Sequence, residues 1–439
     1  MNILLAREIL NTLEVGAIRR DSATRLGQFR PADWDAILSW LRRSGLALYW
    51  WSQLKSSGKA KAVPEKICNQ LDNDLRENTS RLCAMQKEFQ EIILLLEHSE
   101  VPYAVLKGFA LVPEYCPDPA LRSQYDFDFL VSADSLPRLD KSLRDRGFIQ
   151  KLEHRSYNPA VYFHSAREPV LPNSLDNIFS PELHRPVEIH CCLWQLDADK
   201  IRFTLSETSL SRAVIKTWNG TRFFCLPPEE MLLFQVLHTF RHILNNWCRI
   251  SLLLELAVFL HQHAEQEQFW SRFEKLVCRD DRLMEAAGVV FSLSTGLFQS
   301  AVPNEARAFT INRLTTASAF WLRRYGFCSA VQNFSASKSS LYLHGLFIDN
   351  KADWREVRRR RLLPLRKPAI ATRATTGNRM SRLATNSRRL LQVFGRVWFH
   401  AAAAAEYLCG LPAWRRVLKH PTLIRAGEMT ENLRSQALE

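Results

Sequence analysis

The chain of 439 residues lacks the features that would place it within a membrane or outside the cell. No uninterrupted apolar run reaches the roughly 20 residues that a membrane-spanning helix needs. The first residues carry charges inside their apolar run and have no small-residue cleavage site, so no signal peptide is expected. The ten cysteines include no C-x-x-C pair, and the adjacent Cys191 and Cys192 would point to opposite faces of a strand. These absences predict a reduced cytoplasmic protein, either free in solution or peripheral at a membrane.

Length and charge indicate several structural units. An apolar content of 46% and a charged content of 24% are ordinary for a globular protein, but 439 residues are too many for one ordinary core. The net charge is +14, and much of the excess lies beyond Lys351. The sequence therefore predicts an N-terminal helical segment over 1–97, an α+β core over 98–226, a helical domain over 227–350 and a basic C-terminal helical tail over 351–439.

The most informative stretch begins with a short apolar run, residues 103–106, which predicts a buried strand that ends in a turn at Gly108. Residues 125–131 then alternate as a strand does, with Asp126 and Asp128 on one face and phenylalanines on the other. Asp is a poor strand former, and two neighbouring carboxylates repel each other. The pair is typical of a site for a divalent cation such as Mg²⁺. An edge strand with two polar residues in water would explain the same spacing.

A third carboxylate lies in a second alternating run, residues 186–190. Glu188 and His190 fall on the face opposite the apolar side chains of this run. If this strand pairs with the Asp126 and Asp128 strand, three carboxylates meet and can hold two metal ions. Backbone amides of the Gly108 turn can approach a phosphate. Together these features predict metal-assisted phosphoryl or nucleotidyl transfer.

The order of these motifs resembles that of the bacterial uncharacterised nucleotidyltransferase family, which belongs to the polymerase-β-like superfamily. The resemblance rests on Leu106-Lys107-Gly108, Tyr115, Asp118-Pro119, Arg122, Asp126-x-Asp128, Leu130-Val131 and Glu188-Ile189-His190. It covers roughly residues 30 to 275. It implies an α+β fold in which a small mixed sheet carries the carboxylates between an N-terminal helical segment and a C-terminal helical region. Residues 98–226 would form the catalytic core.

The resemblance also implies the reaction. The enzyme would transfer a nucleoside monophosphate from an NTP, with ATP assumed because it is abundant, to an unknown small-molecule or protein acceptor and release pyrophosphate. The catalytic and metal-binding residues would be Asp126, Asp128 and Glu188, holding two Mg²⁺ ions. Glu188 is expected to be a ligand rather than a base, because two nearby cations would lower its pKa. The nucleotide-binding residues would be Lys107, Gly108, Arg122 and His190.

Two positions depart from the family pattern. Phe109 follows the turn where many superfamily members have serine, so a hydroxyl contact to phosphate is missing. Glu255 stands where family members usually have aspartate. On a helix before it, His238 and His242 are one turn apart. Because no third ligand lies next to them in the sequence, we favour a structural or nucleotide-positioning role over metal ligation.

The sequence does not decide which kind of partner the basic tail would bind. Its arginines suit a polyanion such as nucleic acid, an anionic membrane surface or an acidic protein. The apolar stripe that includes Phe394, Val397 and Trp398 suits an interfacial helix, although a packed helix with a solvated basic face is the preferred interpretation.

Two other functions also stay open. One is a catalytically inactive nucleotide-binding or scaffold protein acting through the tail. The other is an RNA-directed enzyme. The retained acids argue against the first, and the lack of a recognisable RNA module argues against the second.

Overall fold

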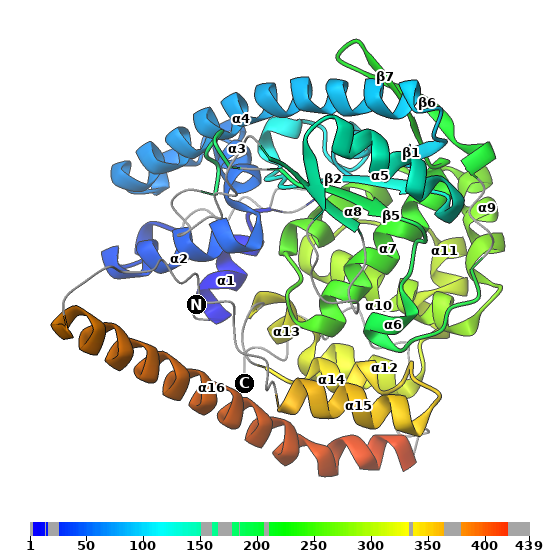
Figure 1. Cartoon of the computed structure of the whole chain (residues 1–439). Helices are drawn as coiled ribbons and strands as arrows, with labels where there is room; N and C mark the ends of the chain where they lie inside the picture. The colour runs from blue at the N-terminus through cyan, green and yellow to red at the C-terminus, as the bar shows by residue number, and fades with distance from the viewer. Residues whose placement is uncertain are drawn as a thin grey trace.

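A computed structural model of the chain describes residues 3–13, 15, 26–150, 160–165, 178–183, 185–205, 210–332, 337–363 and 379–419. Within these residues the protein has a mixed α+β architecture, in which helices cover both faces of one seven-stranded sheet (Figure 1). The predicted α+β class is confirmed. The buried apolar side chains form one continuous cluster that joins the N-terminal helices, the sheet and the C-terminal helices. The predicted division at residues 97, 226 and 350 stays a prediction.

The sheet is mixed, with the strand order β3-β4-β5-β2-β1-β7-β6. Its strands are β1 (Tyr103–Val105), β2 (Phe127–Val131), β3 (Phe148–Gln150), β4 (Ala160–His164), β5 (Val187–His190), β6 (Val214–Trp218) and β7 (Thr221–Cys225). At its centre, β2 pairs antiparallel with β1 and parallel with β5. The two strands that carry the predicted site residues are therefore direct neighbours.

The helices before β1, together with the helix that follows β2, come first along the chain. They are α1 (Ile3–Leu10), α2 (Pro31–Ser44), α3 (Ala47–Ser56), α4 (Glu65–His98) and α5 (Leu136–Asp145). The sequence explains the bounds of α2, because Pro31 begins it and Gly45, in the left-handed region with a φ of 75°, ends it. The long helix α4 crosses one face of the sheet (Figure 1). There Phe89 of α4 packs against Phe127 and Phe129 of β2, with ring centroids 6.1 and 6.3 Å apart.

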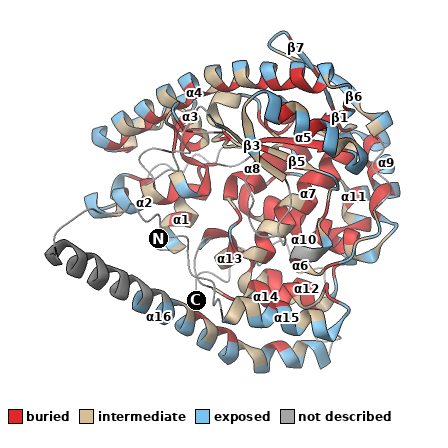
Figure 2. Ribbon diagram, in the orientation of Figure 1, coloured by how far each residue is buried: buried red, intermediate tan, exposed pale blue. Residues whose placement is uncertain are grey.

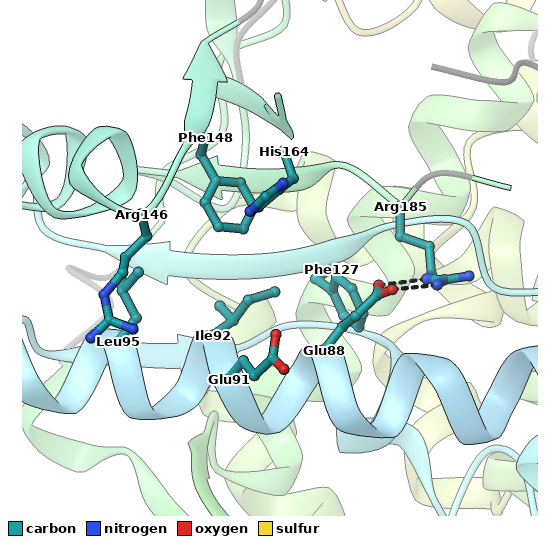
Figure 3. Close-up of a pocket in the computed structure, with 9 residues that line it drawn as sticks. All are labelled: Glu88, Glu91, Ile92, Leu95, Phe127, Arg146, Phe148, His164 and Arg185. Carbon is teal, nitrogen blue, oxygen red and sulfur yellow. Dashed lines mark hydrogen bonds and ion pairs between the residues drawn. The ribbon is translucent and has the colours of Figure 1, made fainter. Parts of the chain in front are cut away.

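A pocket of about 220 Å³ opens between α4 and this face of the sheet (Figure 3). Its floor includes Phe127, and its rim includes an ion pair in which the Nε of Arg185 lies 2.7 Å from Oε2 of Glu88. Since side chains alternate along β2, this pocket lies on the face opposite Asp128.

The remaining helices lie beyond the other face of the sheet. They are α6 (Leu196–Asp199), α7 (Pro228–Asn245), α8 (Ile250–Gln262), α9 (Glu267–Val277), α10 (Asp281–Phe298), α11 (Asn304–Phe309), α12 (Thr316–Trp321), α13 (Phe327–Val331), α14 (Ser340–His344), α15 (Lys351–Leu362) and α16 (Arg379–Lys419). Helices α7, α8 and α10 are buried along most of their length (Figure 2). The last helix, α16, lies along one rim of the molecule (Figure 1).

Most of residues 151–184 lies outside the described residues, but β4 in this stretch pairs antiparallel with β3, which precedes it. A search of the described helices finds none that is both long enough and apolar enough to cross a membrane.

Candidate functional site

The site centres on Asp128 of β2 and Glu188 of β5, which are direct partners in the parallel ladder between the two strands. Burial of Phe127 and Phe129 against α4 turns Asp128 to the other face of the sheet. Asp128 is only 1% exposed, while Glu188 is half-buried. Together with His190, they form a group in which one ligand atom of each residue lies within 4.8 Å of the others. The pairing of these two strands was expected from the sequence.

Asp128 is held through one of its two oxygens. Lys107 donates to Oδ1 from 2.7 Å, and Nε2 of His190 lies 3.0 Å from the same oxygen. The other oxygen, Oδ2, is buried and has no hydrogen-bond partner among the described residues. Buried polar atoms are nearly always satisfied, and an unsatisfied carboxylate oxygen is unfavourable. The free Oδ2 is therefore a natural ligand atom for a cation.

The electrostatics of the site are set by three neighbouring carboxyl groups in a buried environment. Burial raises the pKa of Glu188 to about 8, and the neighbouring carboxylates of Asp126 and Asp128 add to the rise. Burial and Asp128 likewise raise the pKa of Asp126. Burial also acts to raise the pKa of Asp128, but Lys107 and His190 outweigh it and hold that pKa below its ordinary value. Lys107 acts to lower the pKa of all three carboxyl groups, and nearby arginines act in the same direction on Asp126 and Glu188. The pKa values of Asp126 and Glu188 nevertheless stay raised, so a further positive charge would be stabilised here.

These residues fit a hard divalent cation. Carboxylate oxygens are the ligands that Mg²⁺ prefers, and both Asp128 and Glu188 supply them. The nitrogen of His190 belongs to the same group, but it contacts Asp128 Oδ1 and so supports that carboxylate.

Asp126 is where the structure departs from the sequence prediction. The group of potential ligands contains Asp128, Glu188 and His190, whereas the prediction was Asp126, Asp128 and Glu188. The strand begins two residues later than expected, at Phe127, whose amide donates to the carbonyl of Pro186. Asp126 therefore lies before the ladder, half-buried, and acts on the site through its charge.

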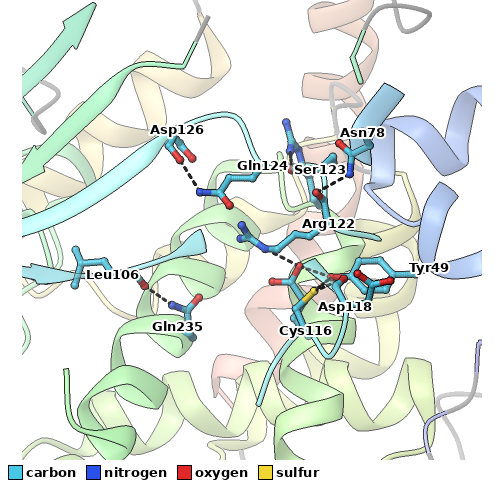
Figure 4. Close-up of polar contacts among 12 residues, drawn as sticks. Tyr49, Asn78, Leu106, Cys116, Asp118, Arg122, Ser123, Gln124, Asp126 and Gln235 are labelled. Carbon is cyan, nitrogen blue, oxygen red and sulfur yellow. Dashed lines mark hydrogen bonds and ion pairs between the residues drawn. The ribbon is translucent and has the colours of Figure 1, made fainter. Parts of the chain in front are cut away.

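The turn predicted at Gly108 is present, with a φ of 64° that favours glycine. A Cβ on Gly108 would lie 2.2 Å from the side-chain nitrogen of Gln124, so the turn and Gln124 are in close contact. Gln124 in turn donates to the carbonyl of Asp126 from 2.9 Å (Figure 4). This link between the turn and the acidic strand was missed, since a single Gln two residues before Asp126 carries no signal of its own.

Arg122 is tied to a helix beyond the sheet. Its Nε donates to Oε1 of Glu255 on α8 from 3.0 Å, and the hydroxyl of Tyr49 lies 3.1 Å from the same oxygen (Figure 4). Burial acts to lower the pKa of Arg122, but Glu255 outweighs it, so the guanidinium stays charged. Its charge also lowers the pKa of Asp126. The glutamate that departs from the family pattern thus has a defined partner.

The other departure, Phe109, belongs to the core. Its ring stacks on Trp218 with centroids 4.2 Å apart and meets Phe89 of α4 edge to face. A serine here would leave the space between these rings unfilled. Phe109 therefore packs the turn against the sheet.

His238 and His242 of α7 lie beside the site. Their rings are 4.4 Å apart, and burial, followed by the charge of Lys107, lowers the pKa of both, that of His242 to about 3. They are neutral at physiological pH. The ligand group found among the described residues includes neither, and their structural or positioning role stays a prediction.

Tyr125 is a feature that sequence reasoning did not anticipate. The guanidinium groups of Arg81 and Arg249 lie over its ring, 5.0 and 4.3 Å from the centroid. Arg81 also donates to the carbonyl of Gln124 from 2.8 Å. Two cations thus stabilise the position of Tyr125, which precedes the acidic strand. The charge of Arg249 also opposes the rise in the pKa of Asp126.

Comparison with protein families gives one match. A family model described as an uncharacterised nucleotidyltransferase matches residues 30–283, which is more than half of the chain. The match begins just before α2 and ends in α10, so it includes the sheet, the carboxylates and the helices that contact them. Searches of curated proteins and of solved structures found no match.

Proposed function

The chain belongs to the uncharacterised nucleotidyltransferase family, and on this premise we propose that it is a Mg²⁺-dependent nucleotidyltransferase of the polymerase-β-like superfamily. It would transfer a nucleoside monophosphate from an NTP to an acceptor hydroxyl or a similar group and release pyrophosphate. ATP is the first donor to test, and the acceptor is a small molecule or a protein.

One observation carries the proposal. Asp128 and Glu188 face each other on neighbouring strands, and Asp128 keeps a buried oxygen without a hydrogen-bond partner among the described residues. The turn at Gly108 follows Lys107, which contacts Asp128. A carboxylate pair beside a tight turn suits a nucleotide triphosphate with its metal.

Each residue of the site has a proposed role. Asp128 and Glu188 would hold Mg²⁺, with Asp126 adding negative charge nearby. When bound, Mg²⁺ would neutralise the triphosphate and lower the pKa of the acceptor. Lys107 and His190 hold Asp128 through Oδ1 and so leave Oδ2 available as a ligand.

In the transfer step, the acceptor hydroxyl loses its proton to water, and its oxygen forms a bond to the α-phosphorus. The bond from that phosphorus to the oxygen bridging the β-phosphate breaks, and its electron pair leaves with pyrophosphate. Backbone amides at Gly108 would contact the β- and γ-phosphates, and Lys107 would balance charge as pyrophosphate leaves. Arg122, already paired with Glu255, would act as a fixed positive charge beside Asp126.

A second function is favoured by a different observation. Lys107 already supplies a positive charge to Asp128, and Asp126 lies outside the ligand group. A catalytically inactive protein that binds a nucleotide, or that acts as a scaffold through its basic tail, would have the same features.

The two functions can be distinguished by following a label on the phosphates of the donor NTP. Purified protein is incubated with Mg²⁺, cell extract and each NTP labelled at either the α- or the γ-phosphate. We expect the α-label alone to appear on an acceptor, and we expect Asp128→Asn and Glu188→Gln to abolish the transfer. Asp134→Asn, an exposed site of the same chemistry, should retain it. Transfer of the γ-label, or equal transfer by Asp128→Asn, would overturn the proposal, and no transfer with retained nucleotide binding would favour the inactive form.

A further inference from the structure

The last helix, α16, has a defined inner side. Tyr407 and Trp414 are buried, and both pack against Tyr342 of α14, with ring centroids 4.7 and 5.1 Å apart. Tyr342 also donates a hydrogen bond to the carbonyl of Tyr407. Gly410 fits closely here, since a Cβ would lie 2.4 Å from the Tyr342 hydroxyl. The rotation of α16 about its axis is therefore fixed by packing.

The opposite side of α16 is apolar and faces away from the protein. With 3.6 residues per turn, the side away from Tyr407 and Trp414 carries Phe394, Val397, Trp398, Ala401, Ala405 and Leu408. All six are exposed, Phe394 by 68% and Trp398 by 77%. Such a stripe of large apolar side chains is unusual on a protein surface and marks an interaction site.

Basic residues lie at the end of this stripe. Arg415, Arg416 and Lys419 are exposed. The same helical phase places Arg416 and Lys419 on the outward side and Arg415 at its edge. Among the described side chains of α16 from Phe394 onward, the acidic one is Glu406, at the flank. From Lys351 to the last residue, the sequence has nineteen Lys and Arg against six Asp and Glu, which is +13 of the net +14.

Helix α15 adds to this positive region. Arg358 and Arg359 of α15 are exposed. Burial raises the pKa of Tyr407, and the charges of the exposed Arg358 and Arg415 oppose the rise, so both arginines lie near Tyr407 at the edge of the α16 packing interface. The apolar stripe is thus bordered by positive charge.

We infer that the outward face of α16 is a membrane-docking surface that lies in the plane of an anionic bilayer. Apolar and aromatic side chains would enter the boundary between headgroups and acyl chains, and the basic residues would contact anionic headgroups. Trp398, the most exposed of the large apolar side chains, is of a type enriched at such boundaries.

Two other occupants fit less well. A second copy of the chain would bring the same positive charge to the interface, and like charges oppose association. A nucleic acid would use the arginines but would leave the apolar stripe of Phe394, Val397 and Leu408 in water. A bilayer accounts for both the charge and the apolar surface.

The test is flotation of the full-length protein with lipid vesicles. We expect binding to vesicles of phosphatidylcholine mixed with phosphatidylserine, little binding to phosphatidylcholine alone, and weakening as NaCl screens the charges. Phe394→Glu/Trp398→Glu should weaken binding at least about tenfold. Each of Arg415→Gln and Arg416→Gln should weaken it about fivefold.

The matched control places the same charges elsewhere. Leu94 on α4 and Ile149 on β3 are exposed apolar residues far from α16 in the fold, and Leu94→Glu/Ile149→Glu should bind vesicles as the natural protein does. All four changed side chains are exposed, so circular dichroism and thermal unfolding should match those of the natural protein. The inference is overturned if the natural protein does not float with anionic vesicles, or if both double variants float equally. It is also overturned if the α16 variant instead loses only RNA binding or self-association.

Discussion

Gly108 is the residue on which the turn beside the carboxylates most depends. It combines a φ of 64° with a neighbour, Gln124, that leaves no room for a Cβ. The sequence was enough to predict the turn, because Gly after an apolar run is a strong local signal. It was not enough to predict Gln124, because the contact joins two segments that only the folded sheet brings together.

Replacing Gly108 tests this contact. Gly108→Ala should lower the free energy of unfolding by about 2 to 4 kcal/mol, because a left-handed φ is unfavourable for Ala and the new methyl group displaces Gln124. Gly58→Ala, at a φ of 70° with no atom within 4 Å of the added Cβ, should lose only about 1 kcal/mol. Urea denaturation measures both changes.

A double variant separates the steric clash with Gln124 from the backbone strain in the destabilisation caused by Gly108→Ala. Gly108→Ala/Gln124→Ala should be about 1 to 2 kcal/mol more stable than the sum of the single effects predicts, because the clash is absent. If Gly108→Ala is no more destabilising than Gly58→Ala, the close contact with Gln124 is wrong.

At the scale of elements, the sequence predicted more of the strands than of their exact ends. The alternation of residues 125–131 and 186–190 placed Phe127, Phe129 and Ile189 in the core, and all three are buried there. The predicted start of β2 was wrong by two residues, because the strand begins at Phe127 and Asp126 therefore lies outside the ladder. Alternation defines which face a residue occupies, but the end of a strand depends on hydrogen bonds to its partner. The first of these joins the amide of Phe127 to the carbonyl of Pro186, the residue before β5.

The ion pair between Arg122 and Glu255 also belongs to this scale, because it fastens the segment before β2 to α8. Glu255 is buried and the Arg122 side chain is only 12% exposed, so removing the cation would leave a buried carboxylate without its ion-pair partner. Arg122→Met should lower the free energy of unfolding by about 3 to 5 kcal/mol. Lys66→Met, which removes an exposed pair with Asp35, should lower it by less than about 1 kcal/mol.

Chemical denaturation of the two variants provides the measurement. Similar small losses in both would mean that Arg122 is not held by Glu255, and its guanidinium would then be available to contact a ligand directly. Such contact was the role expected for Arg122 from the sequence. The structure instead favours a positioning role, because the Nε of Arg122 is already engaged.

At the scale of the whole molecule, the family match covers the part of the chain that holds the candidate site and leaves out the C-terminal helices. The match covers residues 30–283, which hold the carboxylates, the turn and the helices α7 and α8 that contact the site. Helices α15 and α16, with most of the net charge, lie beyond it. The sequence indicated a basic tail and an apolar stripe there. Only the packing of Tyr407 and Trp414 shows which side of α16 faces outward.

The central claim is that Asp128 and Glu188 hold the cation that binds the triphosphate. It is tested most directly by calorimetric titration with an ATP analogue that cannot be cleaved between its α- and β-phosphates, with and without Mg²⁺, because this measurement requires no acceptor. We predict binding that requires Mg²⁺, that Asp128→Asn weakens by at least about tenfold and that Asp134→Asn leaves unchanged. Equal affinity in the absence of Mg²⁺, or undiminished binding by Asp128→Asn, would contradict the claim.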